Sequence, residues 1–220
     1  LLILLLILVL LLLNLLLGSV AIPAQSIWNI LTGTGNEPVS WQNIVWKSRL
    51  PQALTALAAG AGLAVSGLQM QTVFRNPLAG PSVLGISSGA SMGVAFVILL
   101  SGSLGGVALS RLGVMGEIAL SVAAIIGSLS VMALIVYVSQ KVKGNVTLLI
   151  IGVMIGYVSN AVIGVLKFFS VEEDIRAYVI WGLGSFSRVS GNQMMLFVTL
   201  MAILLPLSFL LIKTLNLMLL

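Results

Sequence analysis

The feature that most constrains this chain is a series of long, nearly uninterrupted apolar runs. The first run, LLILLLILVLLLLNLLL, fills residues 1–17 and carries a single polar side chain, Asn14. A run of about 18 or more apolar residues is long enough to cross the hydrocarbon core of a bilayer as a helix. Only 7% of the residues are charged, whereas a soluble domain carries roughly a quarter. The chain is therefore predicted to be an integral membrane protein.

The apolar runs lack the two-residue alternation of barrel strands, so the spans are predicted to be helices. The predicted fold class is all-α, a polytopic transmembrane bundle of about six helices. Residues 18–48 are predicted to form a mixed loop segment with interfacial tryptophans, and residues 171–190 a short surface or re-entrant helix. Pro51 is predicted to open the second helix, and Pro206 to kink the last. The expected spans are residues 1–17, 50–73, 83–100, 115–138, 146–168 and 194–212.

Small residues recur at a spacing of four in three of these helices. Lipid offers no hydrophobic gain to helix packing, so helices associate where small side chains let their backbones approach. This pattern predicts that the helix of residues 50–73 is buried among other helices. The positions are Ala56, Gly60 and Ala64; Gly85, Gly89 and Gly93; and Gly152, Gly156, Asn160 and Gly164.

Several chemistries are excluded by the residues that the sequence lacks. The chain has no Cys and no His, which excludes disulfides, thiolate chemistry and the commonest soft metal ligands. No ionisable residue lies in the middle of a predicted span, which disfavours proton-coupled pumping, and no Walker motif is present. The basic residues are scattered without a patch, so nucleic acid is not expected as a partner. No cofactor or metal is implied. A transport pore powered by a partner fits best, with a structural membrane scaffold as the alternative.

The orientation of the spans stays open on charge alone. If the first span starts inside, six of the ten Lys and Arg residues fall outside and four inside. The positive-inside rule therefore does not support either orientation.

Three stretches carry a resemblance to a known family. The first runs from RLPQ at Arg49 through GAGLAVSGLQMQTVFRNPLAGPSVLGISSGAS. Two of its prolines, Pro77 and Pro81, are four apart and cannot sit inside a regular helix. The second is YVIWGLGSFS at residues 178–187, and the third is the terminal LNLMLL. Together they resemble the FecCD-type permease subunits of binding-protein-dependent, type II ABC importers for iron–siderophore, haem and cobalamin. The motif loop comprises Arg75, Asn76, Pro77, Leu78, Ala79, Gly80 and Pro81.

The resemblance implies ten helices per subunit, with the N-terminus inside, in the cytoplasmic (inner) membrane of a bacterium or archaeon. Two permease subunits, as a homodimer or pseudo-dimer, would form the path through the lipid bilayer. ABC ATPase subunits would hydrolyse ATP on the cytoplasmic side of the membrane, so the chain itself is not expected to be an enzyme. A periplasmic or lipid-anchored substrate-binding protein would dock on the opposite side. Residues 1–220 are expected to be a single permease domain truncated at both ends, lacking the coupling helices and last four helices.

The resemblance also implies roles at both membrane faces. Arg49 would contact acidic residues of the binding protein, but Gln52 stands where the family has its second arginine. A snorkelling interfacial arginine is the alternative for Arg49. Asn145, Val146 and Thr147 match the loop that helps to form the cytoplasmic gate, while an N-cap by Asn145 is the structural alternative. Gly144 is expected to permit the tight turn before them.

The remaining motif positions are expected to shape the structure or to guide the binding protein to it. The motif loop is expected to be architectural. The periplasmic short-helix segment comprises Trp181, Gly182, Gly184 and Ser185. Acidic residues 172–174 are expected to favour the N-terminus of that helix, with guidance of the binding protein as the alternative.

The expected cargo is a bulky metal chelate, a ferric siderophore first, with haem and cobalamin next. This order comes from how common siderophore systems are in the family, and no residue carries it. A secondary transporter is the competing hypothesis, and it should show an ion-coordinating site at mid-membrane, which the sequence lacks.

Overall fold

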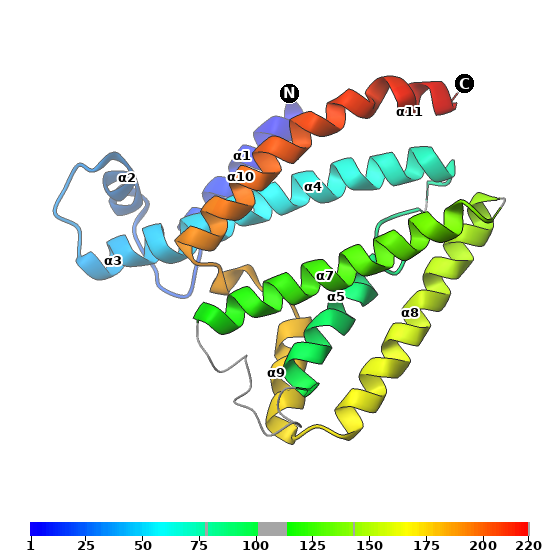
Figure 1. Cartoon of the computed structure of the whole chain (residues 1–220). Coiled ribbons are helices and arrows are strands. Elements are labelled where there is room, and N and C mark those ends of the chain that lie inside the picture. The colour runs from blue at the N-terminus through cyan, green and yellow to red at the C-terminus, as the bar shows by residue number, and fades with distance from the viewer. Residues whose placement is uncertain (78, 101–113, 143, 220) are drawn as a thin grey trace. The chain divides into compact units, whose positions relative to one another are not determined.

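A computed structural model describes residues 1–77, 79–100, 114–142 and 144–219 (Figure 1). At residues 114, 115, 145, 188 and 217–219 it describes the backbone only. Every element of regular structure within these ranges is a helix, which confirms the all-α prediction. The chain divides into two compact units, one of Leu1–Val65 and Ser185–Lys213, the other of Ser66–Gly184 and Thr214–Leu220.

Unit 1 is built from long apolar helices and a small amphipathic segment. Pro23 is the N-cap of α2, and Gly33, with a φ of 71°, ends it. Ser190 and Gln193 form a reciprocal capping box at the start of α10. The elements of this unit are α1 (Leu2–Leu16), α2 (Ala24–Thr32), α3 (Val39–Ile44), a π-helical turn (Val45–Arg49), the first part of α4 (Leu50–Phe74), a 3₁₀ turn (Phe186–Arg188), α10 (Gly191–Ser208), a second 3₁₀ turn (Phe209–Leu211) and the start of α11 (Ile212–Leu219).

The second predicted span starts earlier than the sequence indicates. A single helix of 36 residues runs over Val39–Phe74, so the prediction that Pro51 opens a helix is wrong. The mixed segment predicted for residues 18–48 contains the helices α2 and α3. Proline has no N–H to donate to the carbonyl four residues earlier. The π turn just before it, in which the Leu50 N–H reaches the Val45 carbonyl, accommodates the missing bond.

Unit 2 packs one short helix against its longer neighbours. It contains α5 (Ile86–Ala95) with a π turn (Phe96–Leu100), α7 (Val114–Ser139), α8 (Asn145–Phe168) and α9 (Glu172–Gly182). α5 contacts both α7 and α8 (Figure 1). A Cβ on Gly89 would lie 2.6 Å from the Gly127 carbonyl oxygen, and one on Gly85 would lie 2.7 Å from the Gly152 carbonyl oxygen. These glycines therefore set the distance of closest approach, as the small-residue pattern predicts.

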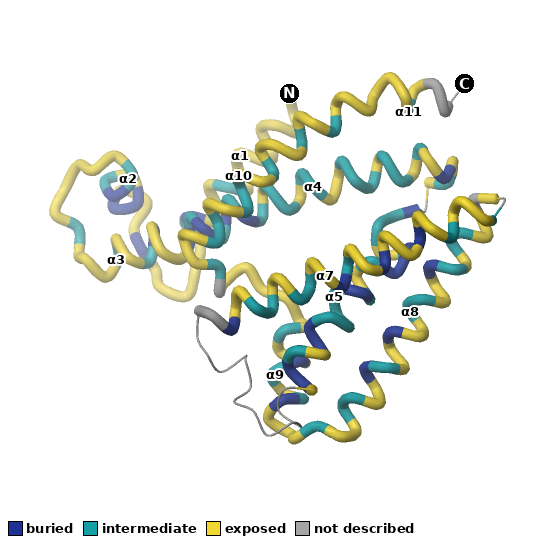
Figure 2. The backbone as a smooth tube through the Cα atoms, in the orientation of Figure 1, coloured by how far each residue is buried: buried dark blue, intermediate teal, exposed yellow. Residues whose placement is uncertain are grey.

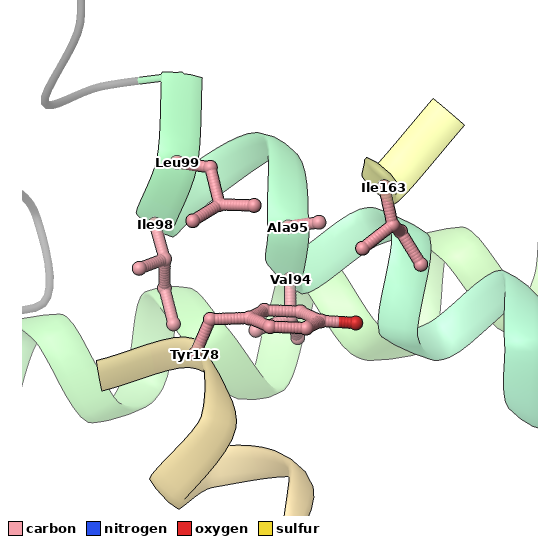
Figure 3. Close-up of a cluster of buried hydrophobic side chains, with 6 residues drawn as sticks. All are labelled: Val94, Ala95, Ile98, Leu99, Ile163 and Tyr178. Atoms are coloured by element: carbon pink, nitrogen blue, oxygen red, sulfur yellow. The ribbon is translucent and has the colours of Figure 1, made fainter. Parts of the chain in front are cut away.

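Two hydrophobic clusters hold unit 2 together. In the first, the Tyr178 ring of α9 lies against Val94 of α5 (Figure 3). The other buried members are Ala95, Ile98, Leu99 and Ile163. The second cluster lies at the other end of α5 and joins the end of α4 to α7 and α8. Its buried members are Phe74, Ala79, Leu84, Val131 and Ile135.

The predicted burial of residues 50–73 is wrong for this chain. Only 11% of the most apolar window of the helix is buried (Figure 2). A Cβ on Gly60 or Gly67 would have no heavy atom within 4 Å, whereas one on Gly62 would lie 3.1 Å from the Met201 sulfur. The helix therefore keeps one small-residue surface without a neighbour among the described residues.

Six apolar helices correspond to the six predicted spans. Four are long and apolar enough to cross a membrane: Val39–Phe74, Gly116–Ser139, Val146–Phe168 and Gly191–Asn216. Two are shorter, Leu2–Leu16 and Ile86–Leu100. Pro206 lies inside α10, and the hydrogen bonding changes to 3₁₀ at Phe209–Leu211, where the sequence predicts a kink.

Candidate functional site

The Arg49 side chain is buried at the end of α1. Its guanidinium Nη1 donates to the Leu15 carbonyl at 2.6 Å and to the Leu16 carbonyl at 3.0 Å, and Nη2 donates to the Val20 carbonyl. The last carbonyls of a helix have no intrahelical partner, and a cation is favourable at this negative end of the helix dipole. Arg49 therefore caps α1 from the π turn before α4.

Gly18 makes room for this cap. A Cβ at position 18 would lie 2.8 Å from Arg49 Nη2, so the glycine lets the guanidinium lie against the backbone that follows α1. Only 5% of the Arg49 surface is exposed, and Gln52 is half-buried. The docking role of these two residues stays a prediction, because a guanidinium that donates to three carbonyls already has a structural role in this chain.

The turn that holds Arg49 also contacts the segment of residues 186–188. Just before that segment, Ser185 Oγ accepts a hydrogen bond from the Ser187 N–H at 3.1 Å. Within unit 1, Arg49 and Ser185, the last residue of the periplasmic short-helix segment, therefore lie close together. A small core of Ile22, Ile27, Ile30 and Val45 supports the same turn.

The short helix predicted within residues 171–190 is α9, in unit 2. Trp181 is half-buried and stacks on Tyr178, with ring centroids 6.4 Å apart. Lys167 Nζ lies 4.9 Å from the centroid of the Tyr178 ring, a cation–π contact. Burial raises the pKa of the Tyr178 hydroxyl, and a hydrogen bond with Ser91 partly offsets the rise. Sequence reasoning missed this cluster, because its members come from three separate helices.

The other residues of that segment are exposed. Gly182 and Gly184 are exposed, and Gly184 has a φ of 66°, a conformation that favours glycine. The acidic residues 172–174 form the first turn of α9, where the N-cap Val171 supplies no side-chain bond. Negative charge there is favourable to the helix dipole, as expected, and Asp174 is 2% exposed.

The predicted gate lies at the start of α8. The N-cap is Gly144, with a φ of 122°, and Asn145 is the first helical residue, so an N-cap at Asn145 is wrong. A positive φ suits glycine, which agrees with the tight turn expected there. Val146 and Thr147 are exposed, and the side chain of Asn145 lies outside the described part of the chain. The gating role stays a prediction.

The motif loop closes α4 with a Schellman motif. The Arg75 N–H bonds to the Thr72 carbonyl at 3.2 Å and the Asn76 N–H to the Gln71 carbonyl at 3.1 Å, the paired bonds that define this cap. Arg75 has a φ of 48° and is the non-glycine residue with positive φ in the described chain. The motif thus turns the chain out of α4, as the two prolines predict.

The rest of the loop also lies in unit 2. The Ala79 N–H bonds to the Asn76 carbonyl at 3.0 Å, and Ala79 is 3% exposed. Pro77 is exposed and Pro81 half-buried, while Leu78 lies outside the described residues. The described part of the chain contains no group of three or more His, Cys, Asp or Glu residues that could hold a metal ion.

Comparisons with known proteins give one consistent result. The profile of the FecCD transport family matches residues 5–220. The hemin transport system permease protein HmuU of Yersinia pestis is 35% identical over 196 residues, which cover 89% of this chain and 54% of that protein. The vitamin B12 import system permease protein BtuC of Pectobacterium atrosepticum is 35% identical over 176 residues, covering 78% and 50%.

A solved structure has a similar fold. It is described as an inward-facing conformation of a metal-chelate type ABC transporter, and it matches with a TM-score of 0.76 and 26% sequence identity. The match covers 97% of this chain and 62% of that chain. The present chain spans about half the length of the curated relatives it matches.

Proposed function

Because the chain belongs to the FecCD transport family, we propose that it forms the membrane-crossing part of a binding-protein-dependent ABC importer for a metal chelate. The observation that carries this proposal is the family match, which extends over nearly the whole chain. The multi-pass helical fold in the inner membrane agrees with it. In this function the chain supplies a path and undergoes alternating access, while ATP hydrolysis on partner subunits drives the change.

The proposed partners are a pair of ABC ATPase subunits, a substrate-binding protein and a second permease subunit. The exposed small-residue surface of α4 at Gly60 and Gly67 supports a helical neighbour, because a helix can approach closely where side chains are small. Arg49 is proposed to act at the extracytoplasmic face. Its guanidinium holds the turn next to residues 186–188, and so it would shape the docking surface as well as contact the binding protein.

We propose a ferric siderophore as the cargo, with haem and cobalamin as the alternatives. Two relatives are named for hemin and vitamin B12, both large metal complexes of a macrocycle. The lack of Cys and His in the chain suits passage of an intact chelate, because strong ligands for the metal would slow its release. The alternative function, a secondary transporter or a membrane scaffold, would not need an ATPase.

The test is uptake into proteoliposomes that hold the full-length permease with its ATPase subunits and cognate binding protein. We expect ATP-dependent accumulation of one radiolabelled chelate from a panel of ferric siderophores, haem and cobalamin. Liposomes without the binding protein serve as the control. Uptake that depends on an ion gradient and does not depend on ATP would show that the chain is a secondary transporter instead.

A further inference from the structure

One end of unit 2 carries positive charge. α4 ends at Phe74, which packs in the same cluster as Ile135 near the end of α7. Arg75 follows directly after α4, and Lys141 lies two residues after α7. Both side chains are exposed. The ends of these two helices therefore present positive charges at the same membrane boundary.

All five acidic residues of the chain lie at other positions. Glu117 is in the first turn of the 26-residue α7, about 33 Å of helix away from its end at Ser139. Residues 172–174 follow the far end of the 24-residue α8, at about 36 Å. Glu37 belongs to unit 1. The acidic side chains of unit 2 therefore lie far from this end.

The left-handed backbone conformation of Arg75 indicates that its side chain has a role beyond ending α4. A φ of 48° places it in the left-handed region, where the Cβ of an ordinary residue costs roughly 1 kcal/mol and glycine costs nothing. Glycine would therefore serve this cap better if the cap were the only requirement. Arg75 and Asn76 also interact with other groups of the chain.

The same residues line a depression. It has a volume of about 410 Å³ and is lined by Gln71, Thr72, Arg75, Asn76 and Pro77. α4 is a membrane span whose last residue, Phe74, is buried, and the exposed Arg75 comes next. The depression therefore lies where the hydrocarbon core meets the headgroups. A planar guanidinium with neighbouring amides and a hydroxyl is suited to bind phosphate oxygens.

We propose that this depression binds the phosphate group of an anionic phospholipid. Arg75 is the main cation of the site, and the amides of Gln71 and Asn76 complete the set of donors. Lys141 adds positive charge at the same end, where its Nζ bonds to the Tyr137 hydroxyl at 2.6 Å. Binding of the headgroup would anchor the end of α4 at the membrane boundary.

The test compares lipid binding by the full-length protein and its variants in neutral detergent. Phosphatidylglycerol, phosphatidylcholine and inorganic phosphate are added separately, and bound lipid is counted by native mass spectrometry. We expect Arg75→Gly and Arg75→Gln to lose about tenfold in phosphatidylglycerol affinity. The glycine variant keeps or raises the melting temperature in phosphatidylcholine, because it relieves the left-handed strain, so its lipid loss is not a folding defect. Lys47→Gln, an exposed cation near the other end of the Val39–Phe74 helix, should bind as the wild type does.

Four results would overturn the proposal. Arg75→Gly could keep its phosphatidylglycerol affinity, or phosphatidylcholine could bind equally well. Inorganic phosphate could raise the melting temperature as much as the lipid, which would make this a free-anion site. Finally, loss of binding on adding the ATPase subunits would show that the surface belongs to that protein partner.

Discussion

Arg49 shows how one buried charge can join two helices that are far apart in sequence. Its guanidinium donates to carbonyls at Leu15, Leu16 and Val20, so the end of α1 is fixed to the start of α4. A docking role predicts a loss of binding-protein contact on mutation, whereas the cap predicts a loss of stability without any partner. The two roles can therefore be measured separately.

We expect Arg49→Ala to lower the free energy of unfolding by about 3 kcal/mol, because one buried and two part-buried carbonyls lose a charged donor. The measurement is thermal melting of the full-length permease in detergent, without the binding protein. Gln52→Ala is the matched control. Gln52 lies three residues after Arg49 and is half-buried, so this variant should melt close to wild type. If Arg49→Ala melts normally but no longer responds to the binding protein, docking is its main role.

Tyr178 gives a pH-dependent prediction. Burial raises the pKa of its hydroxyl above the ordinary value of about 10. The folded state then holds the proton more tightly than the unfolded state, so this contribution to stability is complete below about pH 10 and is lost as the pH rises further. Tyr178→Phe should be about 1 kcal/mol less stable at neutral pH, because the bond with Ser91 is lost.

The difference between wild type and Tyr178→Phe should therefore shrink as the pH is raised above about 10. Melting curves of the two proteins from neutral to alkaline pH measure this difference. Parallel curves over the whole range would mean that the hydroxyl is not buried in the folded protein.

At the scale of elements, close glycine contacts decide how α5 sits against α7 and α8. A Cβ on Gly89 would meet the Gly127 carbonyl oxygen at 2.6 Å, and a backbone atom cannot move aside as a side-chain tip can. Gly60 in α4 offers the opposite case, since a Cβ there has open space. The two glycines form a matched pair of test sites.

We expect Gly89→Ala to destabilise the protein by about 1–3 kcal/mol, because the two helices must separate to admit the methyl group. Gly60→Ala should be neutral or should stabilise by up to about 1 kcal/mol through helix propensity. Thermal melting of both full-length variants tests the pair. Equal melting temperatures would show that α5 and α7 are not in close contact in the membrane.

At the scale of the whole molecule, the lengths of the apolar runs and the positions of the prolines were enough to predict six apolar helices. They also predicted the loop between the second and third of these helices. The same reasoning did not predict the helices within residues 18–48. Helices α2 and α3 are short and mix polar with apolar side chains, so neither forms a long apolar run. They owe their packing to contacts such as Ile27 and Ile30 against Val45, which no local pattern reveals.

The candidate site was harder to predict than the fold. The motif loop and the turn at Gly144 follow from the conformational limits of proline and glycine. The partners of Arg49 do not, because its bond to Leu15 spans 34 residues. The exposed small-residue surface of α4 was misjudged because spacing indicates that a helix can be approached closely, but not which chain approaches it.

The π turn at Val45–Arg49 has a geometric consequence. It inserts one extra residue into an otherwise regular helix, and each α-helical residue turns about 100° around the axis. The wider turn absorbs that extra residue, so it passes through roughly the same angle as a regular turn with one residue fewer. Removing one residue from the turn would therefore restore a regular α-helix and leave α3 facing in nearly the same direction about the α4 axis.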